Sequence, residues 1–84
     1  MSYSKFRKSI HSNEHMAVRN FFIEQRKAQG LSQHALADRL NVIYSLIGKI
    51  ETGDRRLDIV ELVEYCQALH INPCDILELI NQID

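Results

Sequence analysis

The side chains that could do covalent, redox or metal chemistry do not occur in the spacing that such chemistry needs. Cys66 and Cys74 form no C-x-x-C pair, and the chain shows no nucleophile–base pair, carboxylate dyad or glycine-rich phosphate loop. The histidines lack the spacing of metal ligands and are expected at the surface: His11, His15, His34 and His70. We therefore expect a protein that is not an enzyme and that uses no metal and no cofactor.

The cysteines and the hydropathy pattern also bear on location. Without a disulfide pattern, a reduced cytoplasmic setting is the simplest. Cys66 is expected in the core, and for Cys74 an exposed redox-sensing thiol is the alternative. No apolar run approaches the ~20 residues that span a bilayer, and the first twelve residues lack the apolar segment of a secretory signal.

The chemistry that the sequence favours is phosphate binding by a basic surface. The net charge of −1 hides an uneven distribution. All ten Lys and Arg lie in residues 1–56 together with five acids, whereas residues 57–84 hold six acids and no Lys or Arg. A molecule with one basic and one acidic end can bind phosphates through the basic end, with the acidic end facing away.

The segment that would position such contacts is residues 33–52, which is typical of a helix-turn-helix. Ala37 is the small residue at which two helices cross, and Asn41 tolerates the positive φ of a tight turn. Ile47 and Ile50 then supply the inward face of a second helix. A small residue, a turn residue and aliphatic residues at helical spacing together indicate the motif.

Capping residues delimit five predicted helices and no strand. The predicted N-caps are Ser12, Ser32, Asp58 and Asn72. Glu61 gives Asp58 an acidic capping box, Pro73 suits a first helical position, and Gly30 and Gly53 are C-terminal glycines. The predicted helices cover about 13–29, 33–40, 43–52, 59–69 and 73–83. The residues expected to face the core are Met16, Val18, Phe21 and Phe22 in the first helix. In the fourth helix they are Ile59, Leu62, Val63, Cys66 and Leu69.

The length of 84 residues fits one small domain. A chain of this size buries only roughly 60–65% of its unfolded surface and needs a compact core. We expect a single domain over residues 12–84, preceded by a basic N-terminal arm, residues 1–11. For the arm, a solvated terminus and a role in phosphate contact or dimer docking both stay open.

The run from Leu31 to Leu77 resembles the Xre-type, phage-repressor-like helix-turn-helix family. Its most specific parts are LSQ at 31–33, I-E-x-G at 50–53 and ALHINP at 68–73. The resemblance covers about residues 19–79, and the stretch GDRRLDIVEL is similar to a bacterial subgroup of short regulators. It implies an all-α, five-helix DNA-binding domain, usually dimeric, that represses or activates transcription.

The resemblance also implies site residues. In this motif the second helix enters the major groove and the first crosses the backbone. By matching positions, Tyr44, Ser45 and Lys49 point toward bases, and Gln33 matches a phosphate-binding glutamine. Arg26 and Glu51 match an ion pair within the domain. The full predicted set of DNA-binding residues is Gln33, His34, Ile43, Tyr44, Ser45, Lys49, Arg55 and Arg56.

Each of these residues also has a plainer interpretation. Tyr44 could pack half-buried, and Lys49, Arg55 and Arg56 could be solvated surface. The predicted recognition helix is less polar than is usual in the family, because Ile43 stands where Ser or Thr often caps it. Base recognition would then depend more on DNA shape and methyl contacts than on hydrogen bonds.

Two functional hypotheses follow from the residues and the resemblance. The first is a regulator, more often a repressor, that binds double-stranded DNA at a palindromic operator as a homodimer. Its dimer contact would use surplus aliphatic residues of the last helix: Ile76, Leu79, Ile80 and Ile83. The alternative is an antitoxin-like or adaptor module that binds a protein partner through the apolar IYSLIG stretch or the acidic helices.

Overall fold

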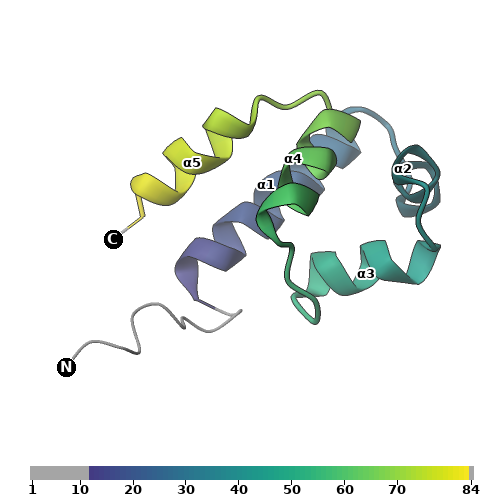
Figure 1. Cartoon of the computed structure of the whole chain (residues 1–84), viewed down its shortest axis with the longest axis horizontal. Helices are drawn as coiled ribbons and strands as arrows, with labels where there is room; N and C mark the ends of the chain where they lie inside the picture. The colour runs from purple at the N-terminus through teal and green to yellow at the C-terminus, as the bar shows by residue number, and fades with distance from the viewer. Residues whose placement is uncertain (1–11, 84) are drawn as a thin grey trace.

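The computed structural model describes residues 12–83, and these form five α-helices and no strand (Figure 1). The helices are α1 (Asn13–Ala28), α2 (Gln33–Leu40), α3 (Tyr44–Thr52), α4 (Ile59–Ala68) and α5 (Pro73–Asn81). The connections between them are three to six residues long. The all-α, five-helix prediction is therefore confirmed, whereas the predicted arm, residues 1–11, lies outside the described residues.

The helices begin where the capping signals predict. Ser12, Ser32 and Asn72 each accept a hydrogen bond from a backbone N–H in the first turn that follows. Asp58 and Glu61 make both bonds of a capping box. Helix α3 differs from the other described helices, because its N-cap is Ile43 and no side chain caps it.

Two turns depend on residues that accept a positive φ. Asn41 ends α2 with φ 57°, which allows the chain to reverse into α3. Gly53 ends α3 with φ 89°. A Cβ at Gly53 would lie 2.8 Å from the guanidinium carbon of Arg19, at the end of a flexible side chain that can move, so the positive φ is the main reason for glycine there.

The core draws on all five helices. Its buried side chains are Phe22, Leu36, Ala37, Ile47, Ile50, Tyr65, Cys66, Leu69 and Ile76. Ala37, predicted at the crossing of two helices, is buried. The rings of Phe22 and Tyr65 pack with centroids 4.7 Å apart and join α1 to α4.

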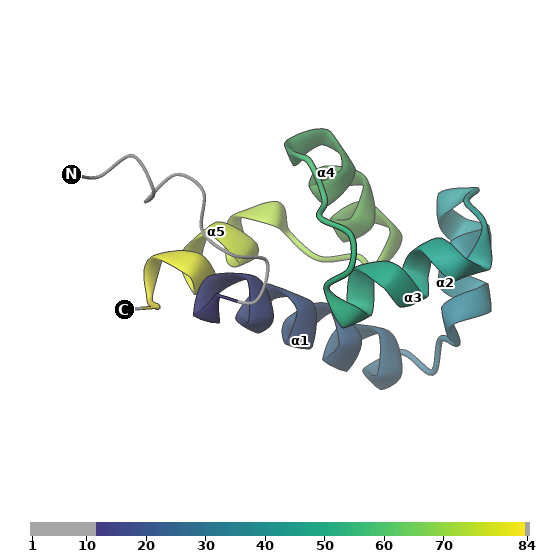
Figure 2. The same ribbon diagram turned by 90° about the horizontal axis from the view of Figure 1, so that it is seen from below.

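Helix α1 runs through the middle of the fold. It packs against α3 and against α5, and α5 lies at the end of the molecule away from α2 (Figure 1). The view from below shows α2 and α3 together at one end and α5 beside the start of α1 (Figure 2). No described helix is long and apolar enough to cross a membrane.

Three predicted packing positions are wrong. Ile59 is 68% exposed and Met16 is 42% exposed, so neither belongs to the core. Ile59 is the first residue of α4 and lies beyond the core's edge, whereas Tyr65, two turns later, is buried. Ile76 was expected to contribute surplus apolar surface but is fully buried, because α5 turns it toward the core.

Candidate nucleic-acid interface

Helices α2 and α3 bring most of the predicted site residues to one end of the molecule (Figures 1 and 2). Gln33 and His34 open α2, and Tyr44 and Ser45 open α3. Tyr44 is 47% exposed, and His34, Ser45 and Lys49 are exposed as well. One turn of helix separates Ser45 from Lys49, so both lie on one face of α3.

A buried ion pair connects this surface to the core. Arg26 Nε donates to Glu51 Oε2 at 2.6 Å, and a terminal nitrogen of the guanidinium donates to Oε1 at 3.1 Å. Another terminal nitrogen donates to the Leu31 carbonyl at 2.8 Å. Both charged side chains are at most 10% exposed, and the pair joins the end of α1 to the end of α3. When a guanidinium binds a carboxylate through two of its nitrogens, the relative orientation of the two groups is closely fixed.

Gln33 extends this network to the surface. Its Nε2 donates to Glu51 Oε1 at 2.8 Å, so Glu51 accepts from both Arg26 and Gln33. An amide nitrogen carries two hydrogens, and the one that does not bind Glu51 can serve another acceptor. The side chain of Gln33 crosses α3 near Gly48, where a Cβ would lie at an ordinary 3.9 Å from Oε1. A residue larger than glycine at position 48 would therefore not clash with the Gln33 side chain through its Cβ.

Two aromatic rings stack across the turn of the motif. The His34 and Tyr44 ring centroids are 3.7 Å apart and their planes differ by 5°. The stack links the second residue of α2 to the first residue of α3. It covers one face of the Tyr44 ring, in agreement with a side chain that is about half exposed.

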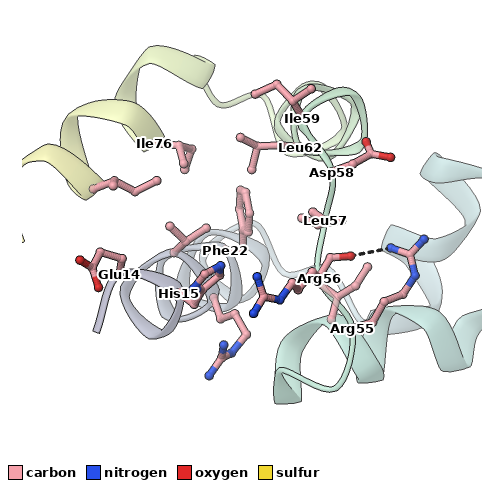
Figure 3. Close-up of a pocket in the computed structure, with 14 residues that line it drawn as sticks. Glu14, His15, Phe22, Arg55, Arg56, Leu57, Asp58, Ile59, Leu62 and Ile76 are labelled. Atoms are coloured by element: carbon pink, nitrogen blue, oxygen red, sulfur yellow. Dashed lines mark hydrogen bonds between the residues drawn. The ribbon is translucent and has the colours of Figure 1, made fainter. Parts of the chain in front are cut away.

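The two arginines after α3 differ in their exposure. Arg55 donates to the Arg56 carbonyl at 2.9 Å (Figure 3). It also donates to both oxygens of Glu61, at 2.7 and 3.1 Å. The hydrogen bonds from Arg55 and from the Asp58 backbone N–H lower the pKa of Glu61 to about 2. The bond to Glu61 in turn raises the pKa of Arg55. Arg55 is thus partly committed to α4, and Arg56 is exposed.

A separate hollow of about 530 Å³ lies between α1, α4 and α5 (Figure 3). Its walls include Phe22, Leu62 and Ile76, with Glu14, His15 and Asp58 at the rim. Arg55 and Arg56 line this hollow, whereas the predicted site residues on α2 and α3 do not. Within residues 12–83 no three His, Cys, Asp or Glu side chains are placed to hold a metal ion.

The sequence did not indicate several of these contacts. The Arg26–Glu51 pair was expected, but the Gln33–Glu51 bond, the His34–Tyr44 stack and the Arg55–Glu61 pair were not. The partners lie 18, 10 and 6 residues apart, and the first two contacts depend on how α2 crosses α3. Only the Arg55–Glu61 pair had a local signal, namely a basic residue placed shortly before the acidic first turn of α4.

Comparison with known proteins gives consistent matches for this fold. A family model described as helix-turn-helix matches residues 22–76. An XRE-family like protein from Pseudomonas syringae pv. tomato str. DC3000 is 32% identical, with a TM-score of 0.77 over 86% of this chain and 90% of that one. A search of curated proteins found no match.

Two further solved structures are similar. The restriction-modification controller protein C.AhdI from Aeromonas hydrophila is 31% identical, with a TM-score of 0.67 over 73% of this chain and 92% of that one. The clp gene regulator ClgR from C. glutamicum shares the fold at 20% identity, with a TM-score of 0.72 over 84% and 92% of the two chains.

Proposed function

This chain belongs to the Xre-type helix-turn-helix family of DNA-binding transcriptional regulators, and we propose that it represses transcription as a dimer on a palindromic operator. The observation that supports this most is the arrangement of α2 and α3. Their first turns present a glutamine, two stacked rings and a serine together, backed by a buried ion pair.

In the proposed complex α3 enters the major groove and presents three side chains to base edges. Ser45 can donate or accept a hydrogen bond, and Lys49 can reach the O6 and N7 of guanine. Tyr44 offers a hydroxyl and a ring face, the latter suited to a thymine methyl. Ile43 is 73% exposed at the start of α3 and adds a second apolar contact with a methyl group.

Phosphate contacts fix the position of α3 in the groove. Gln33 lies at the first position of α2, where unpaired backbone N–H groups and the helix dipole favour an anion. The remaining amide hydrogen of Gln33 can bind the same phosphate, and His34 lies one residue further on. Arg55 and Arg56 add contacts after α3, with Arg55 shared between Glu61 and the DNA.

The proposed dimer contact uses α5 and the start of α4. The exposed apolar residues there are Ile59, Val60, Leu77 and Ile80. Because α5 lies at the end away from α2, a two-fold contact through α5 leaves both copies of α3 available for DNA (Figure 1). Such dimers place their recognition helices about 34 Å apart, one turn of DNA. Sedimentation velocity at tens of micromolar should show a dimer, and monomer alone would contradict this part of the proposal.

The first experiment is fluorescence anisotropy with duplex DNA that the protein itself has selected from random sequence. Wild type, Tyr44→Ala and Gln33→Ala are titrated against the selected and an unrelated duplex at two salt concentrations. Tyr44→Ala should weaken binding to the selected duplex by about 5- to 100-fold, the cost of losing a base contact. Gln33→Ala should weaken binding to both duplexes, because phosphate contacts carry no sequence information.

The result that contradicts the proposal is equally specific. Wild-type binding that is weak, steeply dependent on salt and the same for both duplexes would indicate phosphate contact alone. A module that binds a protein partner through the exposed Ile43 and its neighbours would then explain the apolar start of α3 better.

A further inference from the structure

We propose that His34 is a positioning residue, whose ring holds the Tyr44 side chain in the one orientation that contacts bases. This inference rests on the proposed function, since it assigns a role to Tyr44 in DNA recognition. It adds that His34 contributes to sequence preference through Tyr44, in addition to any phosphate contact of its own.

The geometry of the two rings carries the first step. With centroids 3.7 Å apart and planes within 5°, the rings overlap almost completely. A tyrosine at the start of an exposed helix otherwise has several side-chain rotamers available. A flat partner against one ring face removes most of them, while the residue as a whole stays 47% exposed.

The missing cap of α3 carries the second step. Ile43 offers no side-chain hydrogen bond to the first turn of α3, whereas the other described helices are capped by Ser, Asp or Asn. Without a side-chain cap, this turn is held by packing and by backbone bonds such as that from the Leu46 N–H to the Ile43 carbonyl at 3.1 Å. Tyr44 is the first residue of that turn, and its contact with His34 joins the turn to α2.

The firmness of α2 carries the third step. His34 lies between Gln33 and Ala35, and a hydrogen bond anchors each of these two residues. The Ser32 side chain caps the helix by accepting from the Ala35 backbone N–H at 3.0 Å, and Gln33 donates to Glu51 at 2.8 Å. His34 is therefore fixed to the part of the motif that is tied to the buried ion pair. Tyr44 receives its orientation from that framework through the stack.

The consequence concerns specificity more than folding. Neutral rings gain little from complete overlap, since they prefer offset or edge-to-face arrangements. Both side chains are also exposed, so the contact should contribute little to the stability of the fold. A side chain that is already oriented loses less conformational freedom on binding. The stack should therefore strengthen the contact of Tyr44 with bases.

The first test compares His34→Ala with His34→Phe in the same anisotropy assay. Phenylalanine keeps a flat ring but cannot bind a phosphate. We expect His34→Ala to weaken binding to the selected duplex by about two- to tenfold, the cost of ordering one freed side chain on binding, with a smaller effect on the unrelated duplex. His34→Phe should restore selective binding. The matched control is His70→Asn, which removes an exposed imidazole that belongs to neither α2 nor α3, at a position whose φ of 57° asparagine accepts.

The second test detects the stack without DNA. In the wild-type protein, the His34 ring protons should be shifted upfield in NMR spectra by the Tyr44 ring, and Tyr44→Leu should return them to ordinary values. Thermal melting of His34→Ala should stay close to that of wild type, which separates positioning from a structural role.

Three results would overturn the inference. Equal losses on both duplexes, with no rescue by phenylalanine, would make His34 only a phosphate contact. Absence of the upfield shift would show that the rings do not stack in solution. If the wild type prefers no duplex at all, the proposed function fails and the positioning role fails with it, even where the upfield shift shows an intact stack.

Discussion

Two buried polar side chains of the core, Arg26 and Tyr65, are in contrasting environments. The guanidinium of Arg26 binds both oxygens of Glu51 and the Leu31 carbonyl. The hydroxyl of Tyr65 is buried and has no hydrogen-bond partner among the described residues. Arg26 faces the α2–α3 region and Tyr65 belongs to α4, so the contrast separates the part that presents site residues from the part that packs behind it.

The difference shows where this domain uses polar bonds. In the α2–α3 region hydrogen bonds fix the orientation of side chains, because the Glu51 carboxylate binds both Arg26 and Gln33. Around Tyr65 the packing is apolar, and its ring lies against Phe22. Burial raises the pKa of Tyr65, and the nearby Glu51 charge raises it further, so the phenol stays protonated. Removing a polar group should therefore have opposite effects in the two regions.

The largest expected effect is the loss of the buried cation. Arg26→Met should lower the free energy of unfolding by about 3–5 kcal/mol, because it leaves the Glu51 carboxylate buried with only Gln33 as a partner. Urea denaturation measures the change. The double variant Arg26→Met/Glu51→Leu should be less destabilised than Arg26→Met alone. A single variant as stable as wild type would show that the ion pair is not buried in solution.

For Tyr65, on α4, the free energy of unfolding is expected to change in the opposite direction. Tyr65→Phe removes a hydroxyl that is buried without a partner and should raise the free energy of unfolding by about 1 kcal/mol. The same denaturation experiment tests it. Tyr44→Phe is the matched control, because it removes an exposed hydroxyl and should leave stability unchanged. A destabilised Tyr65→Phe protein would mean that the hydroxyl has a partner after all, and the contrast between the regions would weaken.

The smallest effect concerns the partly exposed Arg55–Glu61 pair, which joins the α3–α4 connection to α4. In the folded protein the pKa of Glu61 lies at about 2, below its ordinary 4.5, so unfolding favours protonation of this carboxylate. Its contribution to stability is complete above pH 4.5 and is lost as the pH falls toward 2. Thermal melting between pH 5 and pH 2.5 should therefore fall less for Glu61→Gln than for wild type.

Salt provides the control for that experiment. Both partners are about one-third exposed, so ions should screen the pair and reduce the difference between the two proteins. A difference that persists unchanged in high salt would indicate that the Asp58–Glu61 capping box, rather than the arginine, dominates the behaviour of Glu61.

Much of the fold could be predicted because its signals are local. A cap such as Ser32 and a turn residue such as Asn41 act on their own helices, so the sequence places helix ends within a few residues. Burial was less predictable. Ile59 and Tyr65 both occur in an apolar helix, and only the position of α4 against α1 decides that Tyr65 enters the core.

The candidate site was likewise predictable only in part. The resemblance and the motif supply which residues gather at the start of α2 and α3. They do not supply the contacts between those residues, because the Gln33–Glu51 bond and the His34–Tyr44 stack are set by the crossing of two helices. Such contacts link side chains across the turn, and no periodicity along a single helix encodes them.

The short connections between the helices have a consequence for how quickly the chain finds its structure. Only three to six residues separate successive helices, so each helix follows the preceding one through a short loop. Little entropy is lost in closing such loops, and helical domains of this kind fold in microseconds to milliseconds. A newly made copy would therefore be competent almost as soon as its last helix is synthesised, so the rate of synthesis, rather than the rate of folding, would limit how fast its concentration rises.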